Sequence, residues 1–306
     1  MIDLLAKQQY NKIAYANLVR QPSGGSIRSN NLGTKAKRYK EDTKLAVPCL
    51  SLEGKIAIVS GSRRGIGRAI ALLYAEAGAD VAVCDYVAGE ELNSTAEEIR
   101  KLGRRSLTVQ VNVSDKASVT NLIQKVEAKL GPVDILANAA GVLRVNPSID
   151  FSEEDWDIVI DTNLKGTFLM NQAVARGMIK RKKGSIINIA STDAFNPLPN
   201  QAAYNCSKIG VRHLTNTLAF EWGLYNVRVN AIAPGCVHTD MMASYGIDDA
   251  VTEAEIALGR MGEPIDIANT ALFLASDRAS WVSGVTWRVD GGTNMGPLSM
   301  WPEEQV

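Results

Sequence analysis

The chain has 306 residues, of which 46% are hydrophobic and 22% are charged. This length is enough for one large hydrophobic core, and nothing in it requires a second domain. The 33 basic and 33 acidic side chains balance, which argues against a polyanion such as nucleic acid as a partner. No run of about 18 apolar residues occurs, so we predict no membrane span.

Cysteine and histidine usage gives no sign of a metal site. The four cysteines, at positions 49, 84, 206 and 236, have no C-x-x-C or other ligand-like spacing, so neither a disulfide framework nor a zinc site is predicted. We interpret His213 as a helix residue and His238 as a loop residue, both without ligand-like neighbours. A reducing compartment fits this composition, and we expect a cytoplasmic protein.

Residues 1–50 differ in charge from the rest of the chain. They hold nine lysines and arginines against three acidic residues, with no acid between Asp3 and Glu41. Residues 21–34 are rich in glycine, serine and asparagine, which break regular structure. We interpret 1–50 as a basic, disordered extension ahead of a catalytic domain over 51–306. The alternative is an organelle transit peptide, since such peptides are also basic and poor in acids; Asp3 argues against it.

The ordered part of the chain is predicted to open with a strand, a glycine turn and a helix. Residues 55–60, K-I-A-I-V-S, are apolar and β-branched, as in a buried strand. G-S-R-R-G-I-G follows at once and leads into A-I-A-L-L-Y-A-E-A, a good helix former. Such a turn directs backbone N–H groups and a helix N-terminus at an anionic group such as a pyrophosphate.

The second strand, residues 80–85, ends in Asp85. An acid placed about 20 residues beyond such a glycine turn hydrogen-bonds the ribose hydroxyls of NAD. Two like charges about 4 Å apart repel by about 4 kcal/mol at an effective dielectric near 20. Asp85 therefore favours NAD over NADP, whose ribose carries a 2′-phosphate.

Strands and helices continue to alternate along the chain. Helices are predicted over 88–101, 115–130, 151–182 and 265–276 and from 202 onward, and strands at 106–111, 133–138, 184–190, 226–233 and 283–292. This alternation predicts an α/β fold, a doubly wound Rossmann sheet of about seven parallel strands in one domain with helices on both faces. Its functional site is expected at the carboxyl ends of the strands.

A serine, a tyrosine and a lysine follow the strand at 184–190. Ser191 stands where that strand ends, and Tyr204 and Lys208 lie four residues apart on the next helix, so the last two share one face. A free tyrosine has a pKa of about 10, and a neighbouring ammonium lowers it by favouring the phenolate. Tyr204 is therefore a candidate general acid and base. Each residue alone also has a structural explanation: Ser191 as a turn residue at the strand end, Tyr204 as a half-buried aromatic and Lys208 as a solvated charge on a helix.

These motifs together resemble one family. Y-N-C-S-K at 204–208, with Ser191 ahead of it, resembles the Y-x-x-x-K signature of the short-chain dehydrogenase/reductase family. S-G-S-R-R-G-I-G at 60–67 resembles its T-G-x-x-x-G-x-G turn, N-A-A-G at 138–141 its N-N-A-G, and P-G-C-V-H-T at 234–239 its P-G-x-x-x-T. The resemblance covers residues 52 to 294 and departs at Ser60, Asn112 and Ala139.

The resemblance implies reversible hydride transfer between a nicotinamide cofactor and a carbonyl or secondary alcohol carbon, with no metal. Tyr204 would exchange the proton, Lys208 would lower its pKa and bind ribose hydroxyls, and Ser191 would hold the substrate oxygen. Asn163 would anchor a water that relays protons to the lysine. Its structural alternative, an asparagine at a helix kink, is compatible with that role, since a kink frees a carbonyl.

The resemblance also implies which residues hold the cofactor: Gly61, Arg64, Gly65, Ile66, Gly67, Asp85, Asn112, Val113, Asn138, Gly141, Tyr204, Lys208, Pro234, Gly235, Val237 and Thr239. A basic residue in the glycine turn often accompanies NADP in this family, so Arg64 opposes the signal of Asp85. We expect NAD, with NADP as the alternative, and interpret Arg63 as solvated.

The substrate is the least determined part. Asp193 lies two residues after Ser191 and could hydrogen-bond a polyol or sugar hydroxyl, or point to solvent as a turn residue. We expect a polyol, sugar or similar small alcohol or ketone. The alternatives are an NADPH-dependent 3-oxoacyl thioester reductase and a non-catalytic NAD-binding scaffold, against which the complete Asn163, Ser191, Tyr204 and Lys208 set speaks.

Two further expectations concern assembly and access. The family forms tetramers through its two long helices, so a homotetramer is expected, with Val211, Leu214 and Leu218 either on that face or in the core. Residues 241–261 are expected to form a mobile lid over the substrate.

Overall fold

The computed structural model describes residues 50–244, 246 and 248–293. The basic extension and its transit-peptide alternative lie outside the described residues. A seven-stranded sheet has the order β3-β2-β1-β4-β5-β6-β7, and every neighbouring pair is parallel. The predicted doubly wound α/β fold is thereby confirmed. The strands are β1 Ile56–Ser60, β2 Asp80–Asp85, β3 Ser106–Gln110, β4 Ile135–Asn138, β5 Gly184–Ile189, β6 Val227–Pro234 and β7 Thr286–Val289.

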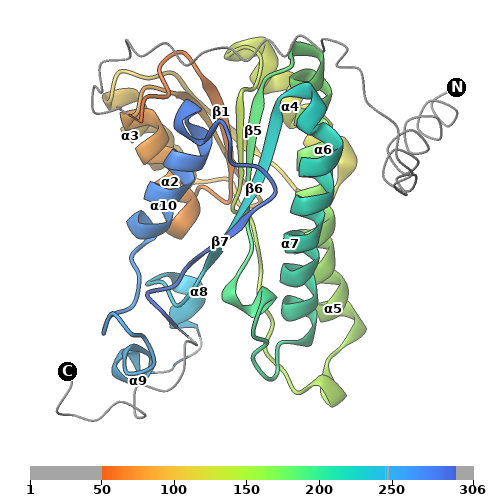
Figure 1. The fold of residues 1–306 in the computed structure, drawn as a ribbon, viewed down its shortest axis with the longest axis vertical. Coiled ribbons are helices and arrows are strands. Elements are labelled where there is room, and N and C mark those ends of the chain that lie inside the picture. Colours follow the sequence, from red (N-terminus) through yellow and green to blue (C-terminus); the bar gives the residue numbers. More distant parts are fainter. Residues whose placement is uncertain (1–49, 245, 247, 294–306) are drawn as a thin grey trace, which may run out of the picture. The chain divides into compact units, whose positions relative to one another are not determined.

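Helices cover both faces of this sheet. Helices α2, α3 and α10 lie on one face, and α4, α5, α6 and α7 lie on the other (Figure 1). The helices are α2 Gly65–Glu76, α3 Glu90–Lys101, α4 Lys116–Lys129, α5 Glu153–Ile160, α6 Gly166–Arg181, α7 Ala202–Trp222, α8 Asp240–Ala243, α9 Asp249–Glu253 and α10 Pro264–Ala275. None of the described helices is long and apolar enough to span a membrane.

Burial on both faces explains the apolar strands. In β1, Ala57 and Val59 pack into the α2 and α10 layer, while Ile56 and Ile58 pack into the α4 and α6 layer. Successive strand residues point to opposite faces, so a strand covered on both sides is apolar at nearly every position. The run I-A-I-V-S follows from this geometry.

The helix predicted over 151–182 is interrupted. It begins at Glu153, where the Ser152 hydroxyl accepts a hydrogen bond from the Asp155 N–H at 3.1 Å, and a π-helical turn, Asp161–Lys165, separates α5 from α6. Such wide turns are frequent at functional sites. This one carries Asn163.

The apolar residues of α7 divide between core and surface. Val211 and Leu218 are buried in two different core clusters, which bears out the core alternative for both. Leu214 is half-buried and packs against the cluster that contains Leu218. The exposed apolar side chains of this helix are Ile209 and Phe220. Within 241–261, short helices α8 and α9 form; the mobility of this segment stays a prediction.

A chain of buried amides links the central strands to the helices behind them. The Asn138 amide of β4 donates to Asn171 of α6 at 2.7 Å and to Asn188 of β5 at 2.9 Å. Asn188 donates in turn to the Thr215 hydroxyl of α7 at 3.0 Å. All four side chains are buried, and these hydrogen bonds offset part of the cost of removing them from water. Within the described residues, the Asn138 Oδ1 and the Asn171 Nδ2 have no hydrogen-bond partner.

Candidate active site

Strand β5 and helix α7 bring the proposed catalytic side chains together. Lys208 is 5% exposed, and its ammonium donates to the Ile189 carbonyl at the end of β5 at 3.0 Å. The same nitrogen lies 5.3 Å from the centre of the Tyr204 ring. Ser191 follows β5 directly, and its hydroxyl accepts from the Asp193 N–H at 3.1 Å. The spacing of four on a helix thus produces the predicted ammonium and phenol pair.

Asn163 is fixed against the same lysine. Its amide oxygen accepts from Val142 N–H at 2.8 Å, and its amide nitrogen donates to the Val142 carbonyl at 2.9 Å and the Ser207 hydroxyl at 3.1 Å. A Cβ placed on Gly141 would lie 3.3 Å from the Asn163 Oδ1 and 3.6 Å from the Lys208 Nζ. Gly141 therefore leaves space beside both of these polar groups.

The freed backbone carbonyl expected at Asn163 has a partner. It accepts the Thr167 hydroxyl at 2.6 Å. A carbonyl oxygen has two lone pairs, and the Thr167 hydroxyl uses one of them. The relay role of Asn163 stays a prediction.

The glycine turn has the close contacts that only glycine permits. A Cβ on Gly67 would collide with the Gly61 carbonyl, and one on Gly61 would lie 2.7 Å from the Ala140 nitrogen. Gly61 and Gly65 also have φ of 66° and 55°, a region that side chains disfavour. The Ser62 hydroxyl ties the turn to β2 by accepting from the Cys84 N–H at 2.9 Å. Backbone packed this closely at the start of α2 forms a cradle suited to a pyrophosphate.

The loop after β6 faces this cradle. A Cβ on Gly65 would lie 3.3 Å from the Thr239 methyl group, and the Thr239 hydroxyl donates to the Val237 carbonyl at 3.2 Å. Gly235 is held against β7, because a Cβ there would lie 2.7 Å from that of Asp290. The structure therefore gathers the predicted residues after β1 and β6 at one edge.

The two arginines of the turn point in different directions. Arg63 is only 17% exposed and places its Nε 3.8 Å from an Asp85 oxygen, and it also pairs with Glu91. Arg64 is half exposed and pairs with Asp240 at 2.5 Å. The interpretation of Arg63 as solvated is wrong: the turn directs it toward β2 and Arg64 outward.

Two asparagines among the predicted cofactor residues use their side chains locally. The Asn112 oxygen accepts from the Ser114 N–H at 3.0 Å and hydroxyl at 2.7 Å, while Val113 is buried. The Asn138 amide nitrogen donates both of its hydrogen bonds to the buried amides of Asn171 and Asn188. Both shape the strand ends, and their contact with a cofactor stays a prediction.

Burial shifts two charged groups of the site toward their neutral forms. It lowers the pKa of Lys208 to about 8, with Asp193 acting in the opposite direction. It raises the pKa of Asp193 to about 6, with Lys208 opposing. The Asp193 carboxylate accepts no hydrogen bond from the described part of the chain. Such perturbed groups are typical of functional sites.

His238 has neighbours that the sequence did not indicate. Its ring nitrogens lie 3.8 Å from carboxylate oxygens of Asp249 and Glu263. Among residues 50–244, 246 and 248–293, no group of three or more histidine, cysteine or acidic side chains is placed to hold a metal.

Comparison with known proteins agrees with this arrangement. A family model described as enoyl-(acyl carrier protein) reductase matches residues 61–294. A 3-oxoacyl-acyl-carrier-protein reductase, FabG, of Thermotoga maritima is 40% identical over 79% of this chain and 99% of its own. A 2-dehydro-3-deoxy-D-gluconate 5-dehydrogenase of Dickeya dadantii is 39% identical over 79% of this chain and 96% of its own.

A solved structure extends the comparison to three dimensions. The gluconate 5-dehydrogenase of Burkholderia cenocepacia, in complex with NADP and tartrate, is 35% identical. It covers 81% of this chain and 98% of its own, with a TM-score of 0.77. The chain belongs to the short-chain dehydrogenase/reductase family. It is an oxidoreductase that uses a nicotinamide cofactor.

Proposed function

We propose that this chain interconverts a secondary alcohol and a ketone on a small polyhydroxylated substrate, using NAD(H). The observation that carries the proposal is the buried Lys208 ammonium, 5.3 Å from the Tyr204 ring. An ammonium in a site of low polarity interacts strongly with charge that develops nearby. The pair fits proton exchange at an oxygen, which both directions of the reaction require.

The chain's own residues supply proton transfer and orientation. The nicotinamide cofactor supplies or accepts the hydride when bound. Tyr204 gives a proton to the substrate oxygen in reduction and removes it in oxidation, and Lys208 stabilises the phenolate. The Ser191 hydroxyl orients the same oxygen. Asn163 holds the water through which Lys208 exchanges protons with solvent.

The residues present fit a dinucleotide. The cradle at Gly61, Gly65 and Gly67 would hold the pyrophosphate, and Asp85 would accept from the adenosine ribose. One Asp85 oxygen already accepts from the Val87 N–H at 3.0 Å. Arg63 is engaged by Glu91, so it is less available to a 2′-phosphate, and this supports NAD over NADP.

Replacing Asp85 with asparagine is expected to exchange the cofactor preference. Removing the carboxylate ends the repulsion of a 2′-phosphate, so the Kd for NADPH should fall by at least about tenfold. The Kd for NADH should rise by about three- to tenfold, because one charged acceptor is lost. Paired fluorescence titrations of the wild type and the variant measure both.

Asp157→Asn, an exposed acid of α5, is the matched control and should change neither value. A wild type that binds NADPH more tightly than NADH would contradict the proposed role of Asp85. So would an Asp85→Asn variant with unaltered preference.

The polyhydroxylated substrate rests on Asp193. Its carboxylate is half-buried beside Lys208 and accepts no hydrogen bond from described residues. It is therefore available to accept a hydrogen bond from a substrate hydroxyl. The names of two similar proteins, a dehydro-deoxy-gluconate dehydrogenase and a gluconate dehydrogenase, point in the same direction.

The KM for a polyol substrate is expected to depend on Asp193 and on pH. The pKa of this acid is raised to about 6, so the carboxylate is present above pH 6 and lost as the pH falls through that value. KM should therefore rise below about pH 6 in the wild type. In Asp193→Asn, KM should be higher by about tenfold at pH 7.5 and independent of pH in this range. Steady-state kinetics from pH 5 to 8 test this, and an unchanged KM in the variant would remove Asp193 from substrate binding.

An NADPH-dependent 3-oxoacyl thioester reductase is the second candidate. The 40% identity to a reductase of acyl-carrier-protein substrates favours it, as does Arg64, a basic residue in the glycine turn. A screen of polyols, sugar acids and acetoacetyl thioesters with both cofactors separates the two candidates. Turnover of thioesters alone, with NADPH, would replace the first proposal by the second.

We also propose a cytoplasmic homotetramer. Ile209 and Phe220 of α7 and Phe168 of α6 keep exposed apolar side chains and would supply the contact in place of Val211 and Leu218. Exposed apolar side chains concentrated on neighbouring helices are typical of interfaces.

A further inference from the structure

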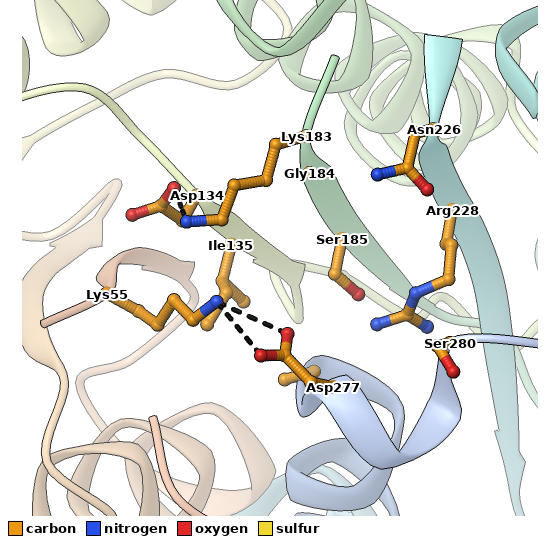
Figure 2. Close-up of a pocket in the computed structure, with 11 residues that line it drawn as sticks. Lys55, Asp134, Ile135, Lys183, Gly184, Ser185, Asn226, Arg228, Asp277 and Ser280 are labelled. Carbon is orange, nitrogen blue, oxygen red and sulfur yellow. Dashed lines mark hydrogen bonds and ion pairs between the residues drawn. The ribbon is translucent and has the colours of Figure 1, made fainter. Parts of the chain in front are cut away.

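A cavity lies at the amino ends of the strands, the edge opposite the candidate active site. It is framed by residues just before or within β1, β4, β5 and β6 and by the turn after α10, and its volume is about 100 Å³. Figure 2 shows the side chains of Lys55, Ser185 and Arg228 converging on this space. The volume suits one small ion with its waters and is too small for a dinucleotide.

The charges around this cavity do not cancel. Lys55, Lys183 and Arg228 face Asp134 and Asp277. The Lys55 ammonium lies 3.2 Å from Asp277, and that of Lys183 lies 3.5 Å from Asp134. These two pairs use both carboxylates, so the lining retains one positive charge.

Arg228 holds the uncompensated charge. Its guanidinium donates to the carbonyls of Ser276 at 3.1 Å and Val282 at 3.4 Å, and within the described residues no carboxylate lies at ion-pair distance from it. Burial lowers its pKa, while Asp277 acts in the opposite direction. A guanidinium carries five N–H donors, so the two carbonyls leave donors for another acceptor.

We propose that this cavity binds a small oxyanion of the phosphate or sulfate type. Arg228 and Lys55 would contact the anion directly, since both side chains are directed into the cavity from opposite sides (Figure 2). Lys183, which is more exposed, would contribute long-range attraction at the mouth. The hydroxyl of Ser280 lines the same space beside Arg228 and adds a neutral donor. The site is separate from the cofactor cradle, because the length of the strands divides the two edges.

Thermal unfolding of the full chain tests the proposal. Inorganic phosphate is titrated at constant ionic strength with NADH in every sample, which keeps the cofactor cradle from contributing. The wild-type Tm should rise saturably, because a ligand that binds only the folded state stabilises it. The apparent Kd should be at least about tenfold weaker in Arg228→Gln. A parallel titration with glycerol 3-phosphate shows whether a phosphate monoester is taken as well as the free ion.

A second variant and a control keep the test decisive. Lys55→Gln should also weaken phosphate at least about threefold, and it stands in for Arg228→Gln if that variant does not fold. Lys165→Gln is the control, because Lys165 pairs with Asp161 at 3.1 Å, much as Lys55 pairs with Asp277. Lys165 lies on the π-helical turn before α6 and does not line the cavity. A Tm that depends on ionic strength alone would overturn the proposal, as would equal phosphate affinity in the wild type and both cavity variants.

Discussion

Tyr204→Phe is expected to lower kcat by about 10³- to 10⁴-fold in both reaction directions, because it removes the proposed proton donor and acceptor. The ring and its contact with Lys208 remain, so the Kd for NADH should change by less than about threefold. Stopped-flow turnover and a fluorescence titration on the same preparation measure the two quantities.

Tyr225→Phe provides the matched control. Tyr225 follows α7 at the amino edge of the sheet and is 42% exposed, so the same loss of a hydroxyl there should leave kcat unchanged. Residual turnover above about one-tenth of the wild type in Tyr204→Phe would assign proton exchange to another group.

Lys208→Met is expected to have the second largest effect. The Lys208 Nζ lies 5.3 Å from the centre of the Tyr204 ring. An ammonium and a phenolate whose charges are separated by about that distance attract by on the order of 3 kcal/mol at an effective dielectric of about 20, equal to about two pKa units. Oxidation, which needs the phenolate, should therefore reach half its maximal rate at a pH higher by about two units. At pH 7.5 kcat should fall by about 10²-fold or more, and a pH profile of alcohol oxidation shows both effects.

Stability separates this electrostatic role from a structural one. Burial lowers the pKa of Lys208 to about 8, so the charged lysine opposes folding below pH 8, and the wild type should gain stability as the pH rises from 8 toward the unfolded value near 10.5. Without cofactor, Lys208→Met should be at least as stable as the wild type at pH 7 and should lack this gain. A large fall in its Tm would indicate instead that the lysine holds β5 to α7. Lys125→Met, on an exposed position of α4, serves as the control.

The sequence correctly predicted the features whose position in the fold is determined by a short continuous segment. A spacing of four placed Lys208 under Tyr204 because both lie on one unbroken helix, and the apolar run before Ser191 placed it at a strand end. The glycine turn followed in the same way, since its residues are consecutive. Local rules are reliable where no distant segment decides the geometry.

What the sequence predicted wrongly or left open concerns side chains whose direction depends on tertiary contacts. Arg63 and Arg64 are adjacent and chemically identical, and only the path of the turn past β2 decides which one meets Asp85. Val211 and Leu218 have the composition of an interface or of a core, and the strands behind α7 decided for the core. The cavity at Arg228 draws residues from β4, β5 and β6, from the position before β1 and from the turn after α10, so no continuous segment carries its pattern.

The buried amides of the central strands have a consequence for how the sheet assembles. Asn138 pairs with Asn188 in the register of β4 and β5, and a slip of one residue would turn each amide to the opposite face, among apolar helices. Leaving such groups without partners is far costlier than mispairing two apolar runs. Strands built from interchangeable Ile, Leu and Ala residues therefore have one alignment that is strongly preferred. Because Gly141 and Ser191 each stand three residues after one of these asparagines, the same preference sets the two halves of the candidate active site at matching heights.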